Sequence, residues 1–90
     1  MNTTDKPEPV RHARVRLLSK PGCHLCDDAR AVIDAVCAEL GERYEEVDIS
    51  SDREAAGRYA EQIPVTFVDG RQHDFWRVDP HRLRRALRGA

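Results

Sequence analysis

One long helical segment between two strand-like segments most restricts how this 90-residue chain can fold. Apolar residues recur at three- and four-residue steps over residues 26–40, and Gly41 follows, which predicts a helix that begins at Cys23. Residues 14–19 before it first alternate between polar and apolar side chains and then become apolar, as in a strand of a sheet covered on both faces. Residues 44–49 after it alternate, as β-strands do. A strand, a helix and a strand in this order form a right-handed crossover with parallel strands.

The segment that follows predicts a short helix and a β-hairpin. Ser51, with a glutamate three positions later, forms a capping-box pattern and predicts the start of the helix. Residues 65–68 and 72–76 are two β-rich runs, and Asp69-Gly70 between them is a strong signal for a two-residue turn. The two strands of such a hairpin are antiparallel.

The C-terminal segment predicts one more helix. Asp79 is a suitable N-cap, and Pro80 occupies the first helical position, where its missing N–H costs no hydrogen bond. Leu83 and Leu87 lie one turn apart on an apolar side, and Gly89 ends the helix. The chain therefore predicts an α/β fold of element order β-α-β-α-β-β-α, in which helices cover both faces of a mixed four-stranded sheet.

Length and charge fit one small domain with no attraction for polyanions. We expect residues 13–90 to form the domain and residues 1–12 to be a disordered tail, because the tail has almost nothing apolar to bury. Fifteen Lys and Arg residues face 16 Asp and Glu residues, so the chain carries no excess positive charge for nucleic acid. Arginines do gather in the last helix, but no motif that reads nucleic acid accompanies them, and we expect a solvated face.

The sequence also argues against a membrane or a secreted location. No apolar run reaches the ~20 residues that a membrane-spanning helix needs, and the first residues lack an apolar stretch of signal-peptide length. Three cysteines, two of them in one tight pair, differ from the disulfide framework of a secreted domain. We therefore expect a monomeric, cytoplasmic protein that binds neither membranes nor nucleic acid.

The cysteine pair lies where its chemistry is favoured. Cys23-His24-Leu25-Cys26 follows the first strand and a Pro-Gly turn, at the predicted start of the long helix. Two cysteines three apart within a helix are too distant for a disulfide, so the pair can close only if Cys23 lies at the non-helical cap. There the unpaired N–H groups and the helix dipole stabilise a thiolate, which makes Cys23 the expected nucleophile. Cys26, on the apolar side of the helix, is expected to be the more buried, resolving thiol.

Charges beside the pair act in opposite directions. A protonated His24 stabilises a Cys23 thiolate, whereas Asp27 and Asp28 oppose it. The two aspartates nevertheless suit the positive end of the helix dipole. From the sequence, the net effect on the thiolate stays open.

Metal binding is the structural alternative for the pair, because two cysteines at this spacing form half of many zinc sites. No second pair is present, and Cys37 lies eleven residues beyond Cys26, about 16 Å further along the helix axis. We expect Cys37 to be a small buried residue, and His12, His73 and His81 to lie at the surface. Metal or iron-sulfur binding by the pair in a dimer remains an alternative.

Three stretches resemble a known family. They are residues 19–26 (Ser-Lys-Pro-Gly-Cys-His-Leu-Cys), residues 44–49 (Tyr-Glu-Glu-Val-Asp-Ile) and residues 63–70 (Ile-Pro-Val-Thr-Phe-Val-Asp-Gly). Together they resemble the glutaredoxin family of the thioredoxin fold, and in particular short bacterial glutaredoxin-like proteins with a Cys-His-Leu-Cys site. The resemblance covers residues 13–88 and implies a thiol-disulfide oxidoreductase that acts through the two cysteines.

The resemblance also implies a substrate site. Pro64 matches the family's cis-proline, and Ile63 before it would offer a backbone N–H and C=O that pair like a strand with a disulfide substrate. Lys20 matches a lysine that contacts the glutathione carboxylate, although it is equally explained as an ordinary exposed charge. His24 and Leu25 replace the family's Pro-Tyr or Pro-Phe and would contact the substrate between the thiols.

A further departure lies after the fourth strand, where bulkier residues around Phe75 and Trp76 replace the family's Gly-Gly. Alternation along a strand sends these two aromatic side chains to opposite faces, so we expect at least one of them in the core. The alternative is an exposed rim that docks a protein partner.

The sequence therefore predicts an oxidoreductase without a bound cofactor. Its substrates would be disulfide-containing proteins or low-molecular-weight mixed disulfides. Glutathione, another low-molecular-weight thiol or a reductase protein would return it to the dithiol state. The alternative from another class is a non-catalytic thioredoxin-fold module that holds a partner at the Pro64 edge and around Trp76.

Overall fold

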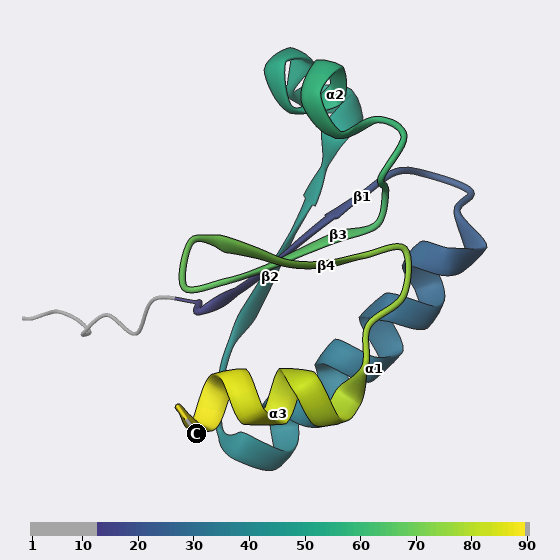
Figure 1. The fold of residues 1–90 in the computed structure, drawn as a ribbon. Helices are drawn as coiled ribbons and strands as arrows, with labels where there is room; N and C mark the ends of the chain where they lie inside the picture. Colours follow the sequence, from purple (N-terminus) through teal and green to yellow (C-terminus); the bar gives the residue numbers. More distant parts are fainter. Residues whose placement is uncertain (1–12, 90) are drawn as a thin grey trace, which may run out of the picture.

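The computed structural model describes residues 13–89, which form a mixed four-stranded sheet with helices on both faces (Figure 1). The elements are β1 (Val15–Ser19), α1 (His24–Leu40), β2 (Tyr44–Asp48), the 3-10 turn η1 (Ile49–Ser51), α2 (Arg53–Tyr59), β3 (Val65–Val68), β4 (Arg71–Phe75) and α3 (Pro80–Arg88). The strand order is β2-β1-β3-β4, with β1 parallel to β2 and antiparallel to β3. The predicted fold class is confirmed, whereas the expected tail of residues 1–12 lies outside the described residues.

Alternation along the central strand β1 divides the core in two. Val15 and Leu17 are fully buried against α1 and α3, including Leu83. Leu18 faces the other side of the sheet and packs with Val65, η1 and α2. Figure 1 shows the same division, since α1 and α3 lie together while α2 lies apart from them. A strand covered on both faces has the near-continuous apolar sequence seen here.

Helix α2 has a different cap from the predicted one. Asp52, not Ser51, is the N-cap: its backbone is extended (φ −133°), and its side chain accepts a hydrogen bond from the N–H of Ala55 at 3.1 Å. Ser51 instead ends η1, in which the side chain of Asp48 accepts a hydrogen bond from the N–H of Ser50 at 2.9 Å. Aspartate caps helices as well as serine does, so residue type could not choose between the two neighbours.

Phe75 and Trp76 are both exposed, at 47% and 50%, so the expectation that at least one lies in the core is wrong. Strand β4 ends at Phe75, and Trp76 has φ 64° in a three-residue turn closed by a 2.8 Å hydrogen bond from the N–H of Arg77 to the C=O of Phe75. Strand alternation therefore does not extend to Trp76. The two rings pack on each other edge to face, with centroids 5.0 Å apart.

Helix α3 begins and ends as predicted. The Asp79 side chain accepts a hydrogen bond from the N–H of His81 at 2.9 Å, and Gly89 ends the helix in a left-handed conformation. Leu83 and Leu87 are buried. Three arginines of this helix pair with carboxylates of the protein itself: Arg82 with Asp74, and Arg84 and Arg88 with Glu39.

His73 on β4 is half-buried, which corrects the expectation of a surface histidine. Its side chain is 11% exposed, and its Nε2 atom is buried without a hydrogen-bond partner among residues 13–89. Burial lowers the pKa of His73; Arg82 acts in the same direction, and Asp74 and Asp79 act against it. The fold therefore favours the neutral imidazole.

Acidification should destabilise the fold through His73. In the unfolded chain histidine titrates near 6.5, above the lowered pKa of folded His73, so the unfolded state takes up the proton first as pH falls. The unfolding free energy should decrease below that pH, by at most about 1.4 kcal/mol per pH unit. Urea unfolding at pH 7.5 and 5.5 measures the difference, and His73→Leu should reduce it. His81→Leu, which removes an exposed histidine, should keep the wild-type difference; equal behaviour of the two variants would contradict the prediction.

Candidate active site

Cys23 lies at the N-cap of α1, as predicted. Its backbone is extended (φ −107°, ψ 110°), and its Sγ accepts a hydrogen bond from the N–H of Cys26 at 3.1 Å. Gly22 before it has φ 69°, a left-handed conformation that favours glycine and turns the chain from β1 into the helix. The Cα atoms of Cys23 and Cys26 are 5.2 Å apart, and the two residues form a disulfide.

The two cysteines differ in exposure. Cys26 is fully buried and packs with Leu18, Ile63 and Val65, whereas Cys23 is half-buried. The difference follows from helix geometry, because Cys26 continues the apolar side of α1 while Cys23 precedes the first turn. Within the Cys23-Cys26 pair, Cys23 is therefore the cysteine that solvent can reach.

The loop before β3 lies against the cysteines. The Ile63-Pro64 peptide bond is cis, and Ile63 packs in the same cluster as Cys23 and Cys26. The C=O of Pro64 accepts a hydrogen bond from the N–H of Trp76 at 2.7 Å, which ties this loop to the end of β4. Between residues 13 and 89, no backbone group pairs with the N–H or C=O of Ile63.

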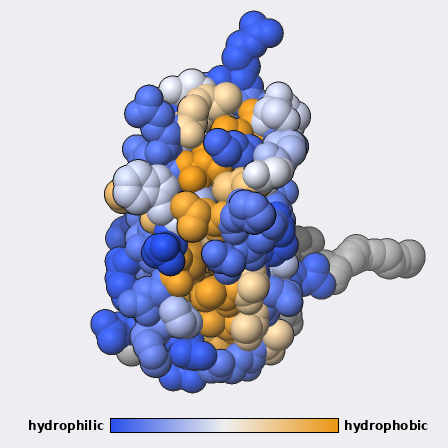
Figure 2. All heavy atoms as spheres, turned by 90° about the vertical axis from the view of Figure 1, so that its right-hand side faces the viewer, coloured by the Kyte–Doolittle hydropathy of each residue, from blue (hydrophilic) through white to orange (hydrophobic). Residues whose placement is uncertain are grey.

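The other predicted site residues lie around this centre. Lys20, in the loop after β1, and His24, the first residue of α1, are exposed, and Leu25 is half-buried. Figure 2 views the side of the molecule on which α1 begins and shows an apolar band between hydrophilic flanks. The structure thus brings Ile63 to the cysteines and leaves Lys20 and His24 at the surface.

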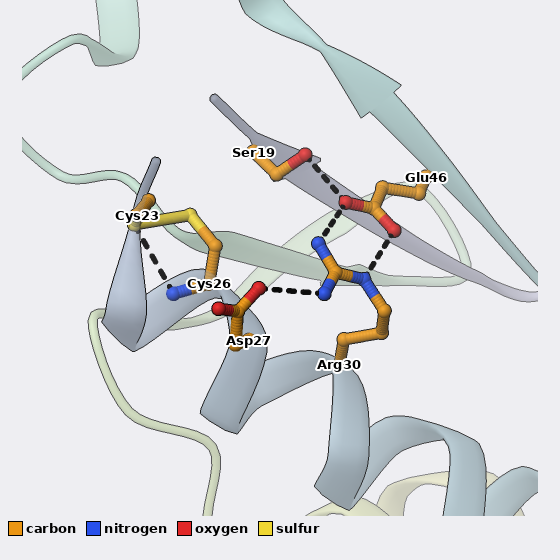
Figure 3. Close-up of a disulfide and its surroundings, with 6 residues drawn as sticks. All are labelled: Ser19, Cys23, Cys26, Asp27, Arg30 and Glu46. Carbon is orange, nitrogen blue, oxygen red and sulfur yellow. Dashed lines mark hydrogen bonds and ion pairs between the residues drawn. A yellow bond between two sulfur atoms is a disulfide. The ribbon is translucent and has the colours of Figure 1, made fainter. Parts of the chain in front are cut away.

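An ion-pair network that the sequence analysis missed lies beside the disulfide (Figure 3). Arg30 of α1 donates two hydrogen bonds of 2.7 Å to Glu46 of β2 and one of 2.8 Å to Asp27. The hydroxyl of Ser19, a buried residue at the end of β1, donates to Glu46 at 2.7 Å. Hydrogen bonds from Arg30, and then from Ser19, hold the pKa of Glu46 below its usual value.

One signal of this network was present in the sequence. Asp27 and Arg30 are three apart on a predicted helix, where opposite charges are neighbours. Glu46, in contrast, was only a polar position of a predicted strand. Its contact with Arg30 depends on how α1 crosses over β1 to reach β2, which local patterns do not specify.

Cys37 lies away from the pair, in the core between the sheet and helices α1 and α3. It is 2% exposed, and burial raises the pKa of its thiol to about 11, so it is protonated at neutral pH. Among residues 13–89, no group of three or more His, Cys, Asp or Glu side chains is arranged to hold a metal ion. No helix in this part of the chain is long and apolar enough to cross a membrane.

Three known proteins are similar to this chain in sequence or in fold. The uncharacterized protein Rv0508 of Mycobacterium tuberculosis (strain ATCC 25618 / H37Rv) is 30% identical over 76 residues, which are 79% of this chain and 78% of that protein. The X-ray structure of XcR50 from X. campestris is 30% identical, covers 84% of this chain and 97% of its own, and has a TM-score of 0.69. Fasciola hepatica thioredoxin, at 22% identity and a TM-score of 0.57, covers 83% of this chain and 77% of its own, and shares the fold.

The thioredoxin-like fold, with a cysteine pair at the start of its first helix, supports a redox function in general terms. The family model of the Glutaredoxin-like domain (DUF836) matches residues 14–88. The match spans both cysteines, the Ile63-Pro64 loop and every helix and strand described above. The chain therefore belongs to the Glutaredoxin-like domain (DUF836) family.

Proposed function

We propose that the protein is a thiol-disulfide oxidoreductase that reduces disulfides of proteins or of small thiols through Cys23 and Cys26. One observation carries the proposal: the half-buried Cys23 occupies the N-cap of α1, and its sulfur accepts a hydrogen bond from the backbone N–H of the fully buried Cys26. A sulfur at this position meets unpaired N–H groups and the positive end of the helix dipole, which favour a thiolate. Thiolates, not thiols, attack disulfides.

The reaction proceeds in two exchanges. The Cys23 thiolate attacks a substrate disulfide, so that a Cys23-substrate bond forms, the substrate S–S bond breaks and one substrate thiolate leaves. Cys26 loses its proton and attacks the Cys23 sulfur, which closes the Cys23-Cys26 disulfide and releases the second substrate thiolate. Two electrons pass from the cysteine pair to the substrate, and the two released thiolates take up two protons, one from Cys26 and one from solvent.

Recovery needs an external reductant of two electrons. Two molecules of glutathione, an equivalent low-molecular-weight thiol or the dithiol of a reductase would reverse both exchanges and become oxidised. The protein itself would need no bound cofactor and would act as a monomer. The surroundings of the cysteines support this use: Ile63 has unpaired backbone groups for an extended substrate, and Lys20, His24 and Leu25, which lie close to Cys23 along the chain, are exposed or half-buried.

The exposed aromatic pair also favours a second candidate, a non-catalytic module that holds a protein partner. Phe75 and Trp76 are large, exposed and fixed, since the indole N–H of Trp76 donates to the C=O of Glu61 at 3.1 Å. Aromatic side chains of this kind are enriched in protein interfaces. A binding-only function predicts that Cys23→Ser with Cys26→Ser leaves partner binding unchanged.

Removal of the nucleophile should abolish turnover. Cys23→Ser should lower the reduction rate of hydroxyethyl disulfide with glutathione by about 100-fold or more, because serine cannot form the mixed disulfide. Cys37→Ala, which removes the buried third cysteine, should retain wild-type rates. In parallel, equilibration in a glutathione buffer should show a two-electron couple between about −180 and −270 mV. Undiminished activity of Cys23→Ser, or a pair that never forms a disulfide, would refute the assignment.

The three thiols should react in a fixed order. In the reduced protein, iodoacetamide at pH 7 should modify Cys23 first, because it is the partly exposed cysteine at the helix cap. Cys26 and Cys37 are buried and should react at least about tenfold more slowly. Peptide mass mapping over time gives the order, and denatured protein serves as the control in which all three react alike. Modification of Cys37 ahead of Cys23 in the folded protein would be inconsistent with this site.

The aromatic pair should matter for protein substrates alone. Trp76→Ala should lower kcat/KM for insulin disulfides by about tenfold, the usual scale for loss of an aromatic anchor. The same variant should reduce hydroxyethyl disulfide within about twofold of wild type, since a small substrate does not span the distance of a protein interface. Arg71→Ala, a change at an exposed residue of the preceding strand β4, is the control. Equal losses on both substrates would show that Trp76 supports the fold rather than docking.

A further inference from the structure

Arg30 joins three elements that meet at the dithiol. It lies one turn after Cys26 on α1, and its N–H groups bind Asp27 from the first turn of the same helix and Glu46 from β2. Through Ser19, Glu46 is also tied to the end of β1, where the loop to Cys23 begins. The Arg30 side chain is 39% exposed, so water only partly screens these contacts.

The two carboxylates in this network disfavour a thiolate at Cys23 unless a cation compensates their charge. Asp27 directly follows Cys26, and a carboxylate in the first turn weakens the positive field that a thiolate at Cys23 uses. Glu46 stays ionised because its hydrogen bonds to Arg30 and Ser19 hold its pKa low. Without a cation, two negative charges would lie beside the dithiol. Arg30 compensates one of them and fixes the position of both carboxylates.

Other charged or titratable groups near the cysteines do not share this role. They are Lys20 of the loop, His24 and Asp28 of α1, Asp48 of β2 and Tyr59 of α2. None of these five side chains is hydrogen-bonded to Arg30, Asp27 or Glu46. Of the charged groups near the cysteines, Arg30 is therefore the cation that is hydrogen-bonded to both carboxylates.

We propose that Arg30 is a positioning residue for the dithiol: by holding Asp27 and Glu46, it preserves the positive field at the start of α1 in which the Cys23 thiolate forms. The proposal rests on the proposed function, because it assigns Arg30 an effect on the nucleophile of that reaction. Arg30 touches neither sulfur nor substrate and acts through the two carboxylates. It therefore predicts a change in the acidity of Cys23 rather than a loss of the fold.

The test is the pH dependence of Cys23 alkylation in the full-length, reduced protein. The rate constant for iodoacetamide is measured at Cys23 by mass spectrometry from pH 4 to 9, and its midpoint gives the thiol's ionisation. Arg30→Gln should raise this midpoint by about 0.5 to 1 pH unit, which at low pH is a three- to tenfold lower rate. The matched control is Arg16→Gln, because Arg16 of β1 pairs at 2.6 Å with Glu45, the neighbour of Glu46 on β2. It should leave the midpoint within about 0.2 pH unit.

A double-mutant cycle separates the proposed route from a general loss of positive charge. If Arg30 acts by holding the carboxylate of Asp27, then adding Asp27→Asn to Arg30→Gln should return the midpoint most of the way to the wild-type value. Asp27→Asn alone should change the midpoint less. Arg30→Lys, which keeps the charge but cannot bridge two carboxylates with a planar fork, should give an intermediate midpoint. An unchanged midpoint in Arg30→Gln, or equal effects of Asp27→Asn in both backgrounds, would overturn the proposal.

The experiment also distinguishes this proposal from the function on which it rests. Alkylation needs no turnover, so the cycle can be completed whatever the protein reduces. If the wild-type midpoint lies at the ordinary thiol value and Arg30→Gln does not move it, the role of Arg30 is rejected. The proposed disulfide exchange is then tested separately, by the reduction-potential measurement. If circular dichroism shows that Arg30→Gln does not fold, Arg30→Lys takes its place in the cycle, with the same sign expected and a smaller shift. If that cycle shows no coupling between residues 30 and 27, the proposed role of Arg30 is rejected as well.

Discussion

Strand β1 must bury both of its faces, and the positions of the two cysteines depend on this constraint. It lies between β2 and β3, with Leu17 in the core under α1 and α3 and Leu18 in the smaller core under α2. The chain leaves β1 at the end of the sheet and has to return along one face as α1. The first turn of α1 therefore lies at the junction of the two cores. Cys26 fills the smaller core from there, and Cys23, one turn earlier, stays at its edge.

Much of this arrangement was predictable because local sequence patterns specify it. Helical periodicity, the glycine after α1 and the Asp69-Gly70 turn each specify an element, and both turn residues adopt the positive φ that such a hairpin needs (52° and 82°). The cap position of Cys23 followed from disulfide geometry alone. The features that were missed depend on something else. The cap of α2 is a choice between two equally suitable neighbours, Ser51 and Asp52, that only the preceding turn decides.

Long-range geometry explains the other differences. Strand alternation placed one of Phe75 and Trp76 inside, but a turn at Trp76 ends the strand first. Arg30 and Glu46 are 16 residues apart, and their contact depends on the crossover between α1 and β2. A local sequence pattern therefore does not predict it. Local patterns therefore specify the elements, whereas the surroundings of the thiols arise from how the elements pack.

Comparison of Cys26 with Cys37 shows which of these surroundings matters for chemistry. Both cysteines lie on α1 and both are buried, so burial alone does not distinguish them. Cys37 lies in the last turns, near the negative end of the helix dipole, and Glu42 and Asp34 raise the pKa of its thiol beyond the effect of burial. Cys26 lies in the first turn, where the dipole favours negative charge, and within disulfide distance of a partner at the cap. Position along the helix, rather than burial, therefore decides which buried cysteine can form a disulfide with Cys23.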